Sequence, residues 1–254
     1  MSITEDAPAM APDREVSATR VRMSWWWLVA ASVTVLVAAA VTLFVWWLAT
    51  RETRTTTYRV LGDLAALQLD LGDADVEVDG GATAVEVKRV DEFAFGRPSE
   101  ERHTLTGGHL DVVSRCPDQV LGSCHASYRV AVPDNVPVMI ETSRGSVRLS
   151  GVRASVEVST GSGAITATGF CGFSLRASSD SGDVSAVSEC SADRLELRSR
   201  TGDVRAVVPV GRYEVDAQSD SGTTRVRGLT VVDDAPFQVQ ALSTSGDVTV
   251  EAAS

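Results

Sequence analysis

The residues of this chain best suited to chemistry are four cysteines and three histidines. Cys116, Cys124 and His125 fall close together, while His103 and His109 lie a little earlier. Thiolate and imidazole are common zinc ligands, but a structural zinc site needs four ligands, and this segment offers no second ligand pair. We therefore expect a disulfide in this segment and no metal site, with His125 as a bystander.

Aspartates in glycine turns are a second candidate for metal binding. Asp183, Asp203 and Asp247 each follow a glycine directly, and stacked carboxylates could hold calcium. Their spacing does not match the nonapeptide calcium repeat, and Thr223 interrupts the column. We expect these aspartates to stabilise the turns instead. Since the chain also lacks GxSxG, HExxH, CxxC and phosphate-loop motifs, the sequence predicts no catalytic residue, no cofactor and no metal.

A repeat organises the C-terminal half of the chain. Apolar residues stand two and four positions after, and five and seven positions before, each of six glycines, except that Thr224 stands two positions after Gly222, and a Ser or Thr stands three positions before each. The spacing of two is typical of a strand with one buried face. Each repeat is thus predicted to be a strand, a glycine turn, a second strand and a looser turn. The six turn glycines are Gly145, Gly163, Gly182, Gly202, Gly222 and Gly246.

The similarity of equivalent positions favours an all-β parallel β-solenoid with rungs of about 20 residues and two strands each. The alternative is an antiparallel β meander or sandwich. Glu157, Arg176 and Glu196 occupy one outward column with alternating charge, which would hold neighbouring rungs in register. The last strand, 247–251, lies at the end of the repeats, so we expect a free edge there that pairs with a second copy or a partner.

The cysteine spacing tests these two folds. Cys171 and Cys190 each follow a turn glycine by eight residues. Stacked rungs would place their Cα atoms about 4.8 Å apart, within the disulfide range of about 4.4 to 6.8 Å, whereas a meander would separate them by about 10 Å. The solenoid therefore predicts a Cys171–Cys190 disulfide and, by elimination, a Cys116–Cys124 disulfide.

An apolar segment precedes the repeats. From Trp25 to Ala49 there is no charged residue, and tryptophans stand at both ends. Eighteen helical residues rise about 27 Å, close to the thickness of the hydrocarbon core, so residues 23–50 are predicted to form a membrane-spanning helix and not a cleaved signal peptide. Arginines are balanced on the two sides, but all four cysteines follow the helix, as expected if the C-terminal domain lies in an oxidising exterior. We thus expect a single-pass membrane protein with a cytoplasmic N-terminus. Lys88 is the single lysine among 23 basic residues, which indicates the codon bias of a GC-rich bacterial genome, so the membrane is expected to be that of a bacterial cell.

The remaining segments complete the predicted organisation. Residues 1–22 are polar and are expected to form a disordered cytoplasmic tail. Residues 51–59 are expected to form a stalk, and residues 60–254 the extracytoplasmic solenoid. Within the solenoid, 60–135 are predicted to form a cap and irregular rungs, with a surface loop from Asp91 to Arg102, and 136–254 the regular repeats. Ala74 takes the place of a turn glycine in the first rung.

The opening LQLDLGDADVEV, the strand YRVAVPDNVPV and the SGDV turns behind an N-terminal anchor resemble the bacterial envelope family called "putative adhesin". The resemblance covers about residues 60–254. It implies adhesion, so we expect a non-catalytic, membrane-anchored envelope protein that presents an adhesin-like β-solenoid outside the cell, with an envelope protein or a glycan as its ligand. Two alternatives are an accessory or sensor in envelope-stress signalling and, from fold analogy alone, a polysaccharide-active enzyme. With 34 acidic against 23 basic residues, the chain is not expected to bind nucleic acid.

Overall fold

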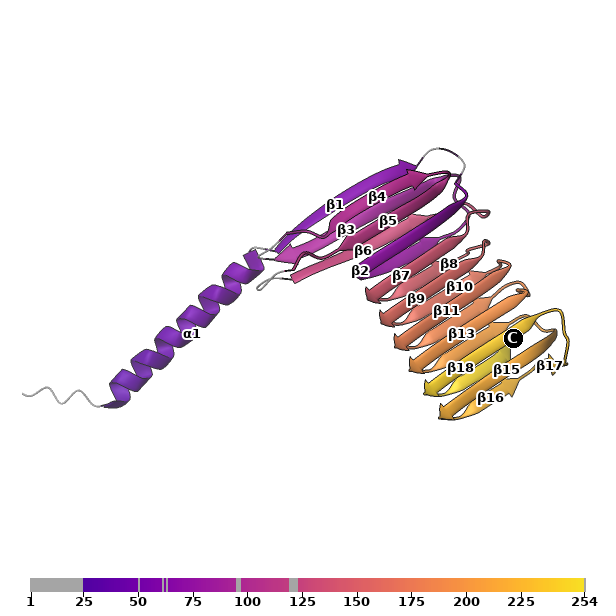
Figure 1. The fold of residues 1–254 in the computed structure, drawn as a ribbon. Coiled ribbons are helices and arrows are strands. Elements are labelled where there is room, and N and C mark those ends of the chain that lie inside the picture. Colours follow the sequence, from indigo (N-terminus) through magenta and orange to yellow (C-terminus); the bar gives the residue numbers. More distant parts are fainter. Residues whose placement is uncertain are drawn as a thin grey trace, which may run out of the picture. The chain divides into compact units, whose positions relative to one another are not determined.

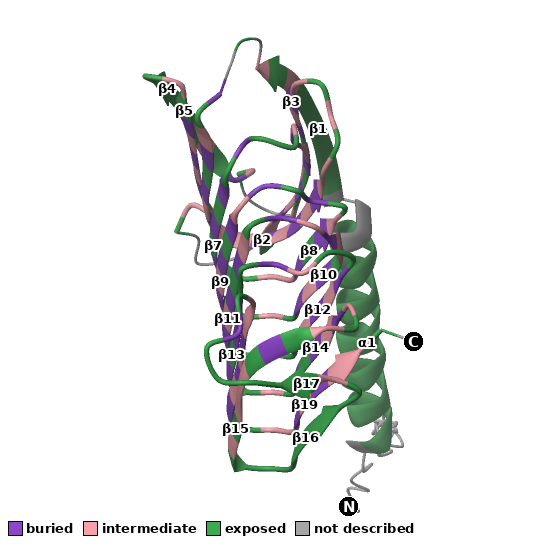
Figure 2. Cartoon of the chain, turned by 90° about the vertical axis from the view of Figure 1, so that its right-hand side faces the viewer, coloured by how far each residue is buried: buried purple, intermediate pink, exposed green. Residues whose placement is uncertain are grey.

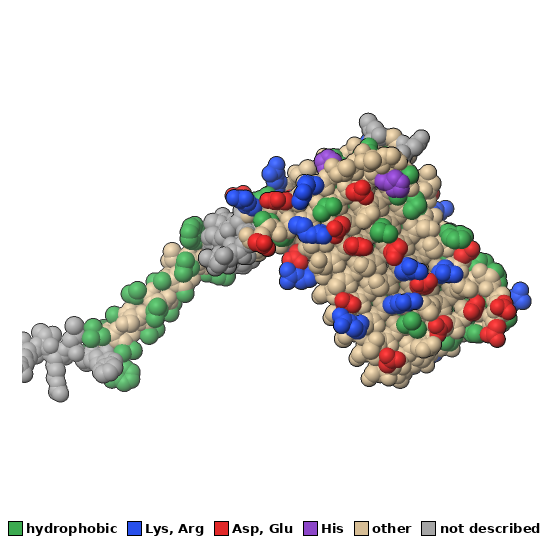
Figure 3. Space-filling model, in the orientation of Figure 1, with side chains coloured by type: hydrophobic (Ala, Val, Ile, Leu, Met, Phe, Trp, Pro, Cys, Tyr) green, Lys and Arg blue, Asp and Glu red, His purple; other side chains and the backbone are tan. Residues whose placement is uncertain are grey.

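The computed structural model describes residues 25–49, 51–60, 62, 64–94, 97–118 and 123–253. The chain divides into two compact units, a helical one and a β domain. The single described helix, α1 (Trp25–Ala49), is long and apolar enough to cross a membrane, with Trp26–Trp46 as the candidate span. Figure 3 shows hydrophobic side chains along its surface, as expected for a helix that faces lipid. The tail predicted for residues 1–22 lies outside the described residues.

The β domain consists of two facing layers of strands (Figures 1 and 2). In spatial order, layer B contains β4 (Glu100–Thr106), β5 (His109–Arg115), the first half of β2 (Ala66–Asp79), β7 (Val138–Arg144), β9 (Val156–Ser162), β11 (Ser174–Ser181), β13 (Arg194–Thr201), β18 (Gln238–Ser245) and β15 (Arg212–Ser221). Layer A contains β1 (Arg51–Val60), β3 (Val85–Ala94), β6 (Ser123–Ala131), the second half of β2, β8 (Val147–Ser150), β10 (Ile165–Phe170), β12 (Val184–Ser188), β14 (Val204–Val208), β19 (Val248–Ala252) and β16 (Thr224–Arg227). A short strand, β17 (Thr230–Val231), pairs with the start of β15.

The regular repeats stack in parallel, which confirms the solenoid and excludes the meander. Leu175 of β11, for example, lies beside Val156 of β9 on one side and Leu195 of β13 on the other. The inward positions of interior rungs are almost entirely buried, so they form one continuous core between the layers. Ala74 of β2 occupies the turn position next to Gly145, as the sequence predicts. Only β1, β3 and β4, at one end of the stack, join their neighbours in antiparallel fashion among the described strands.

The glycine turns lie too close together for a side chain. Gly163 has a φ of +149°, and a Cβ atom added to it would lie 2.1 Å from the carbonyl oxygen of Gly145. The hydroxyl side chain three residues before a turn glycine donates a hydrogen bond to the turn glycine of the neighbouring rung. Ser179 Oγ donates to Gly163 O at 3.0 Å, and Ser199 Oγ donates to Gly182 O at 2.8 Å. The repeated Ser or Thr thus hydrogen-bonds successive turns to each other, and the repeated Gly allows them to pack closely.

The order of rungs in space differs from their order in the chain at both ends. The C-terminal rung β18/β19 lies between β13/β14 and β15/β16, and the N-terminal rung β2 lies between β5/β6 and β7/β8. The expectation that strand 247–251 forms the free edge is therefore wrong, because β19 pairs with β14 on one side and β16 on the other. At this end of the stack the edge strands are β15 and β16.

Charge explains the inserted position of the C-terminal rung. Stacking in chain order would place Glu196 beside Asp216 and Arg205 beside Arg225, and like charges directly opposite each other destabilise a sheet. With β18/β19 inserted, Gln240 separates the two acids and accepts a hydrogen bond from Arg198 at 2.6 Å. Thr249 likewise separates the two arginines.

The same rule holds at the other end of the stack. Glu77 of β2 lies between Arg129 of β6 and Arg148 of β8, and it accepts hydrogen bonds from Arg129. Each inserted rung therefore places a neutral or oppositely charged side chain between two side chains of like charge, which would otherwise repel each other.

Two expectations about the N-terminal part of the domain are wrong. Residues 51–59 are not a stalk, because β1 pairs with β3 over its whole length. Asp91 does not open a surface loop, because it lies within β3 and its side chain is only 2% exposed. Both β1 and β3 contain many polar residues. A polar strand is easily mistaken for a loop in the sequence, because the strands that it pairs with lie elsewhere in the chain.

Candidate functional site

A groove of about 750 Å³ crosses the strands of layer B at their N-terminal ends. Its lining runs from β5 through β2, β7, β9, β11 and β13 to β18. At about 4.8 Å per strand, these six steps span about 29 Å. The groove is thus long enough for an extended ligand, and solenoids often bind ligands along such a surface.

The groove combines apolar anchors with polar side chains. Phe173, in the turn before β11, is 66% exposed, and Met139 of β7 is also exposed. Pro137 and Pro236 add apolar surface to the lining. Exposed aromatic surface beside convergent polar groups is typical of binding sites.

A ladder of charged side chains lies along the groove. Arg176 Nε donates to Glu196 Oε2 at 2.9 Å, and Arg176 Nη1 lies 3.8 Å from Glu157 Oε1. The hydrogen bond to Glu196, followed by the charges of Glu196 and Glu157, raises the pKa of Arg176. The alternating column expected from the sequence is therefore present. Arg176 thus hydrogen-bonds Glu196 of one neighbouring strand and forms a longer ion pair with Glu157 of the other.

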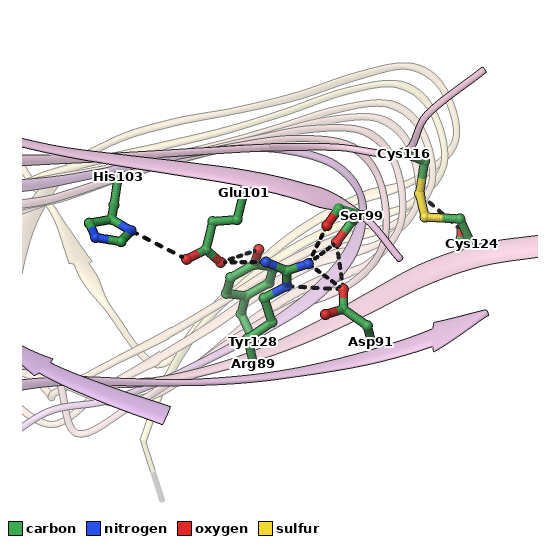
Figure 4. A network of polar contacts seen from close by, with 8 residues as sticks. All are labelled: Arg89, Asp91, Ser99, Glu101, His103, Cys116, Cys124 and Tyr128. Atoms are coloured by element: carbon green, nitrogen blue, oxygen red, sulfur yellow. Dashed lines mark hydrogen bonds and ion pairs between the residues drawn. A yellow bond between two sulfur atoms is a disulfide. The ribbon is translucent and has the colours of Figure 1, made fainter. Parts of the chain in front are cut away.

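A second candidate, which no motif in the sequence indicates, is a buried polar cluster inside the cap (Figure 4). Arg89 donates to Asp91 Oδ1 from Nε at 2.9 Å and from Nη2 at 2.7 Å. Its Nη1 also lies 3.3 Å from Glu101 Oε2, which accepts a hydrogen bond of 2.8 Å from the Tyr128 hydroxyl. Ser99 Oγ donates to Asp91 at 2.5 Å. The cluster thus joins β3, β4, β6 and the segment before β4.

The titration behaviour of this cluster follows from its burial. Burial and then the negative charge of Glu101 raise the pKa of Tyr58, which stacks on His103 with ring centroids 5.3 Å apart. Burial would lower the pKa of Arg89, but the hydrogen bond to Asp91 and the nearby negative charges outweigh it and raise that pKa. Both shifts favour the form present at neutral pH, the neutral phenol of Tyr58 and the charged guanidinium of Arg89. We therefore assign the cluster to holding the cap strands together.

Aspartates of the glycine turns form a hydrogen-bonded ladder. Asp183 Oδ1 accepts from Asp203 N at 2.8 Å, Asp203 Oδ1 from Asp247 N at 2.8 Å, and Asp247 Oδ1 from Thr223 N at 2.9 Å. The backbone hydrogen bond from Thr223 is the largest cause of the lowered pKa of Asp247. These contacts give the aspartates the turn-stabilising role expected of them. Because the rung that carries Asp247 is inserted before the rung that carries Thr223, Thr223 lies at the end of the column of aspartates and does not interrupt it.

The four cysteines form the two expected disulfides. Cys171 and Cys190 join adjacent rungs with a Cα–Cα distance of 4.8 Å, and Cys116 joins Cys124 at 5.9 Å. His125 Nε2 lies 3.1 Å from Asp75 Oδ2 on the neighbouring strand β2, so the imidazole is next to a carboxylate. Within the described part of the chain, no three His, Cys, Asp or Glu side chains are grouped so that they could hold a metal ion.

The repeat geometry agrees with a family comparison. Residues 122–228 match the family Toastrack DUF4097. The Toastrack match extends from β6 to β16, so it includes the regular rungs but neither the inserted rung β18/β19 nor β2. A search of curated proteins found no match to the chain.

A search of solved structures found proteins that align with most of the chain. A "putative cell adhesion protein" from Clostridium sporogenes ATCC 15579 aligns with a TM-score of 0.50 at 10% identity, covering 80% of this chain and 100% of that one. A "putative adhesin" from Bacteroides fragilis NCTC 9343 aligns with a TM-score of 0.46 at 12% identity, covering 80% and 97%. At such identities the likeness concerns the fold alone.

Proposed function

We propose that this chain is a single-pass envelope protein whose β domain lies outside the cell, where it binds an extended glycan without catalysis. The groove of layer B is the observation that carries the proposal. Its length suits a polymer, and Phe173 offers an exposed aromatic face against which a sugar ring can pack. The names of the structural neighbours, which refer to adhesion, are in keeping with this role.

The charge of the groove narrows the ligand class. Its lining includes the carboxylates of Asp111, Glu157, Asp193 and Glu196, but only two guanidinium groups, those of Arg176 and Arg194. This excess of acid disfavours anionic polymers such as teichoic acids and favours neutral or cationic glycans. Elsewhere the charges are mixed, and Figure 3 shows acidic and basic side chains interspersed over one face of the domain.

Binding is tested with two hexasaccharides of the same backbone, one of N-acetylglucosamine and one of glucosamine, titrated calorimetrically into the full chain in detergent micelles. We expect one or both to bind, and Phe173→Ala to weaken binding at least tenfold. Val210→Ala, which removes an equally exposed apolar side chain outside the groove lining, is the matched control. Equal binding by wild type and Phe173→Ala, or no binding of either sugar, would contradict this function.

The outward orientation rests on the cysteines. All four cysteines of the chain are in disulfides, and disulfides persist in oxidising compartments. Protease added to intact protoplasts is expected to degrade the β domain and leave a fragment of about the first 50 residues. Protection of the C-terminal domain, with degradation only after lysis, would place it in the cytoplasm and refute the proposal.

A further inference from the structure

The strands β15 and β16 form one end of the stack, and the core is partly open there. Val226 of β16 belongs to an inward column, yet it is 39% exposed, whereas Val250 and Ala206 in the same column of the next rungs are 0% exposed. Val215 and Ala217 of β15 are likewise only partly buried. Figure 2 shows the exposed β16 at the end of the two layers. Leu229, in the segment after β16, packs against the core, but within the described residues no further rung covers Val215, Ala217 and Val226.

The backbone at this end is also free to pair. Glu214 N donates to Phe237 O on the β18 side, while Tyr213 O accepts from Val232 N on the opposite side. Since neighbouring residues of a strand point their backbone groups to opposite edges, those of Val215 and Ala217 face away from β18. In β16, Thr223 O accepts from Val248 N, so Thr224 and Val226 face away from β19. Among the described strands, β17 covers only the start of β15, and these free groups lie beyond it.

The outward side chains of the two free strands carry opposite charge. On β15 the first, Arg212, lies beside β17, and those beyond it are Glu214, Asp216, Gln218 and Asp220; on β16 they are Arg225 and Arg227. A strand laid on β15 therefore pairs best if it is basic, and one laid on β16 if it is acidic. A second copy of this chain offers both strands at once.

We propose that two copies of this chain join at this end through a twofold axis parallel to the strands. This axis lays β16 of each copy against β15 of the other in antiparallel orientation, and it brings the open cores together. A twofold axis perpendicular to the layers would instead lay acidic β15 on β15 and basic β16 on β16. Charge complementarity selects the first arrangement.

The repeat sets the register of this contact. Ala217 precedes Gly222 by five residues and Val226 follows it by four, so these two inward side chains occupy the same level along the rung. Asp216 and Arg227, one residue further on each strand, therefore also share a level. In the dimer Arg227 of one copy lies opposite Asp216 of the second copy, twice by symmetry. Neither residue lines the layer B groove, so the contact is independent of ligand binding.

The test is sedimentation velocity of the full chain in detergent micelles over a range of protein concentrations. We expect a concentration-dependent dimer. Val226→Lys puts a charge into the open core at a position already partly exposed, and it should weaken the dimer at least tenfold. Val210→Lys makes the same change at an exposed site outside both free strands and should leave the dimer unchanged.

Charge exchange identifies the pairing. Asp216→Arg alone and Arg227→Asp alone each create two like-charge contacts and should weaken the dimer, whereas the double variant should restore it. Circular dichroism of each variant shows whether the domain remains folded. A wild-type chain that stays monomeric at all concentrations, or a folded double variant that dimerises no better than the single ones, would overturn the proposal.

Discussion

The Cα atoms of Cys171 and Cys190 lie 4.8 Å apart, which equals the spacing of neighbouring strands in a sheet. The disulfide between them therefore clamps two adjacent rungs without displacing either backbone. A loop of 19 residues closed in this way is expected to contribute about 3 kcal/mol through the entropy of the unfolded chain. Replacing both cysteines with serine should lower the free energy of unfolding by about that amount, measured by urea denaturation. Non-reducing peptide mapping of the wild type checks the pairing, and a Cys116–Cys171 link would contradict the rung register.

Gly163 and Gly151 provide a matched pair of substitutions. Both have positive φ, but a Cβ on Gly163 would lie 2.1 Å from Gly145 O, whereas one on Gly151 would meet nothing within 4 Å. Gly151→Ala should cost about 1 kcal/mol for the left-handed backbone alone. Gly163→Ala should cost about 3 kcal/mol or more, because two turns must move apart. Similar unfolding free energies for the two variants would show that the turns are not in contact.

Val250 and Val226 test the inserted position of the C-terminal rung. Val250 lies four residues from the C-terminus and is 0% exposed, so Val250→Ala should cost about 2 to 3 kcal/mol. Val226→Ala should cost less than about 1 kcal/mol, because its side chain is already partly exposed. The experiment is run at protein concentrations below dimer formation. If the rungs followed chain order, Val250 would be the exposed residue and the ranking would reverse.

Arg89 should be essential to the cap. Arg89→Met leaves the carboxylates of Asp91 and Glu101 buried without their cation, which should cost about 3 to 5 kcal/mol. Arg129→Met removes an arginine that also contacts a glutamate, Glu77, but at an exposed position where solvent screens the pair, so the loss of stability should be much smaller. Thermal unfolding followed by circular dichroism compares the two. A loss no greater for Arg89→Met than for Arg129→Met would mean that the cluster does not stabilise the cap.

Much of the fold could be predicted from local spacing. The two-residue alternation around each glycine identified the inward columns, because a strand buries every second side chain whatever its neighbour is. The equal offset of Cys171 and Cys190 from their glycines placed them in one column, and the parallel register followed from it. The apolar span was equally clear, because the length of a membrane helix is fixed by the bilayer.

The groove and the cap cluster could not be predicted in the same way. The groove needs Phe173, Met139 and Arg176 side by side, and their adjacency depends on which rungs stack. The cap cluster joins Arg89, Glu101 and Tyr128 from three strands, and nothing near any of them in the chain marks it as buried. The role of a polar residue in a strand depends on its hydrogen-bond and ion-pair partners, and only the tertiary structure shows which residues these are.

The sequence by itself therefore determined what a rung is, and the tertiary structure decided which rungs are neighbours. The inward columns are nearly interchangeable, since Val, Leu and Ala fill the core of any rung, so they cannot order the stack. The outward charges do order it: Gln240 separates Glu196 from Asp216, and Glu77 separates Arg129 from Arg148. These contacts join segments far apart in the chain. Their interaction energies therefore exist only once the rungs have stacked, and the sequence alone does not show them.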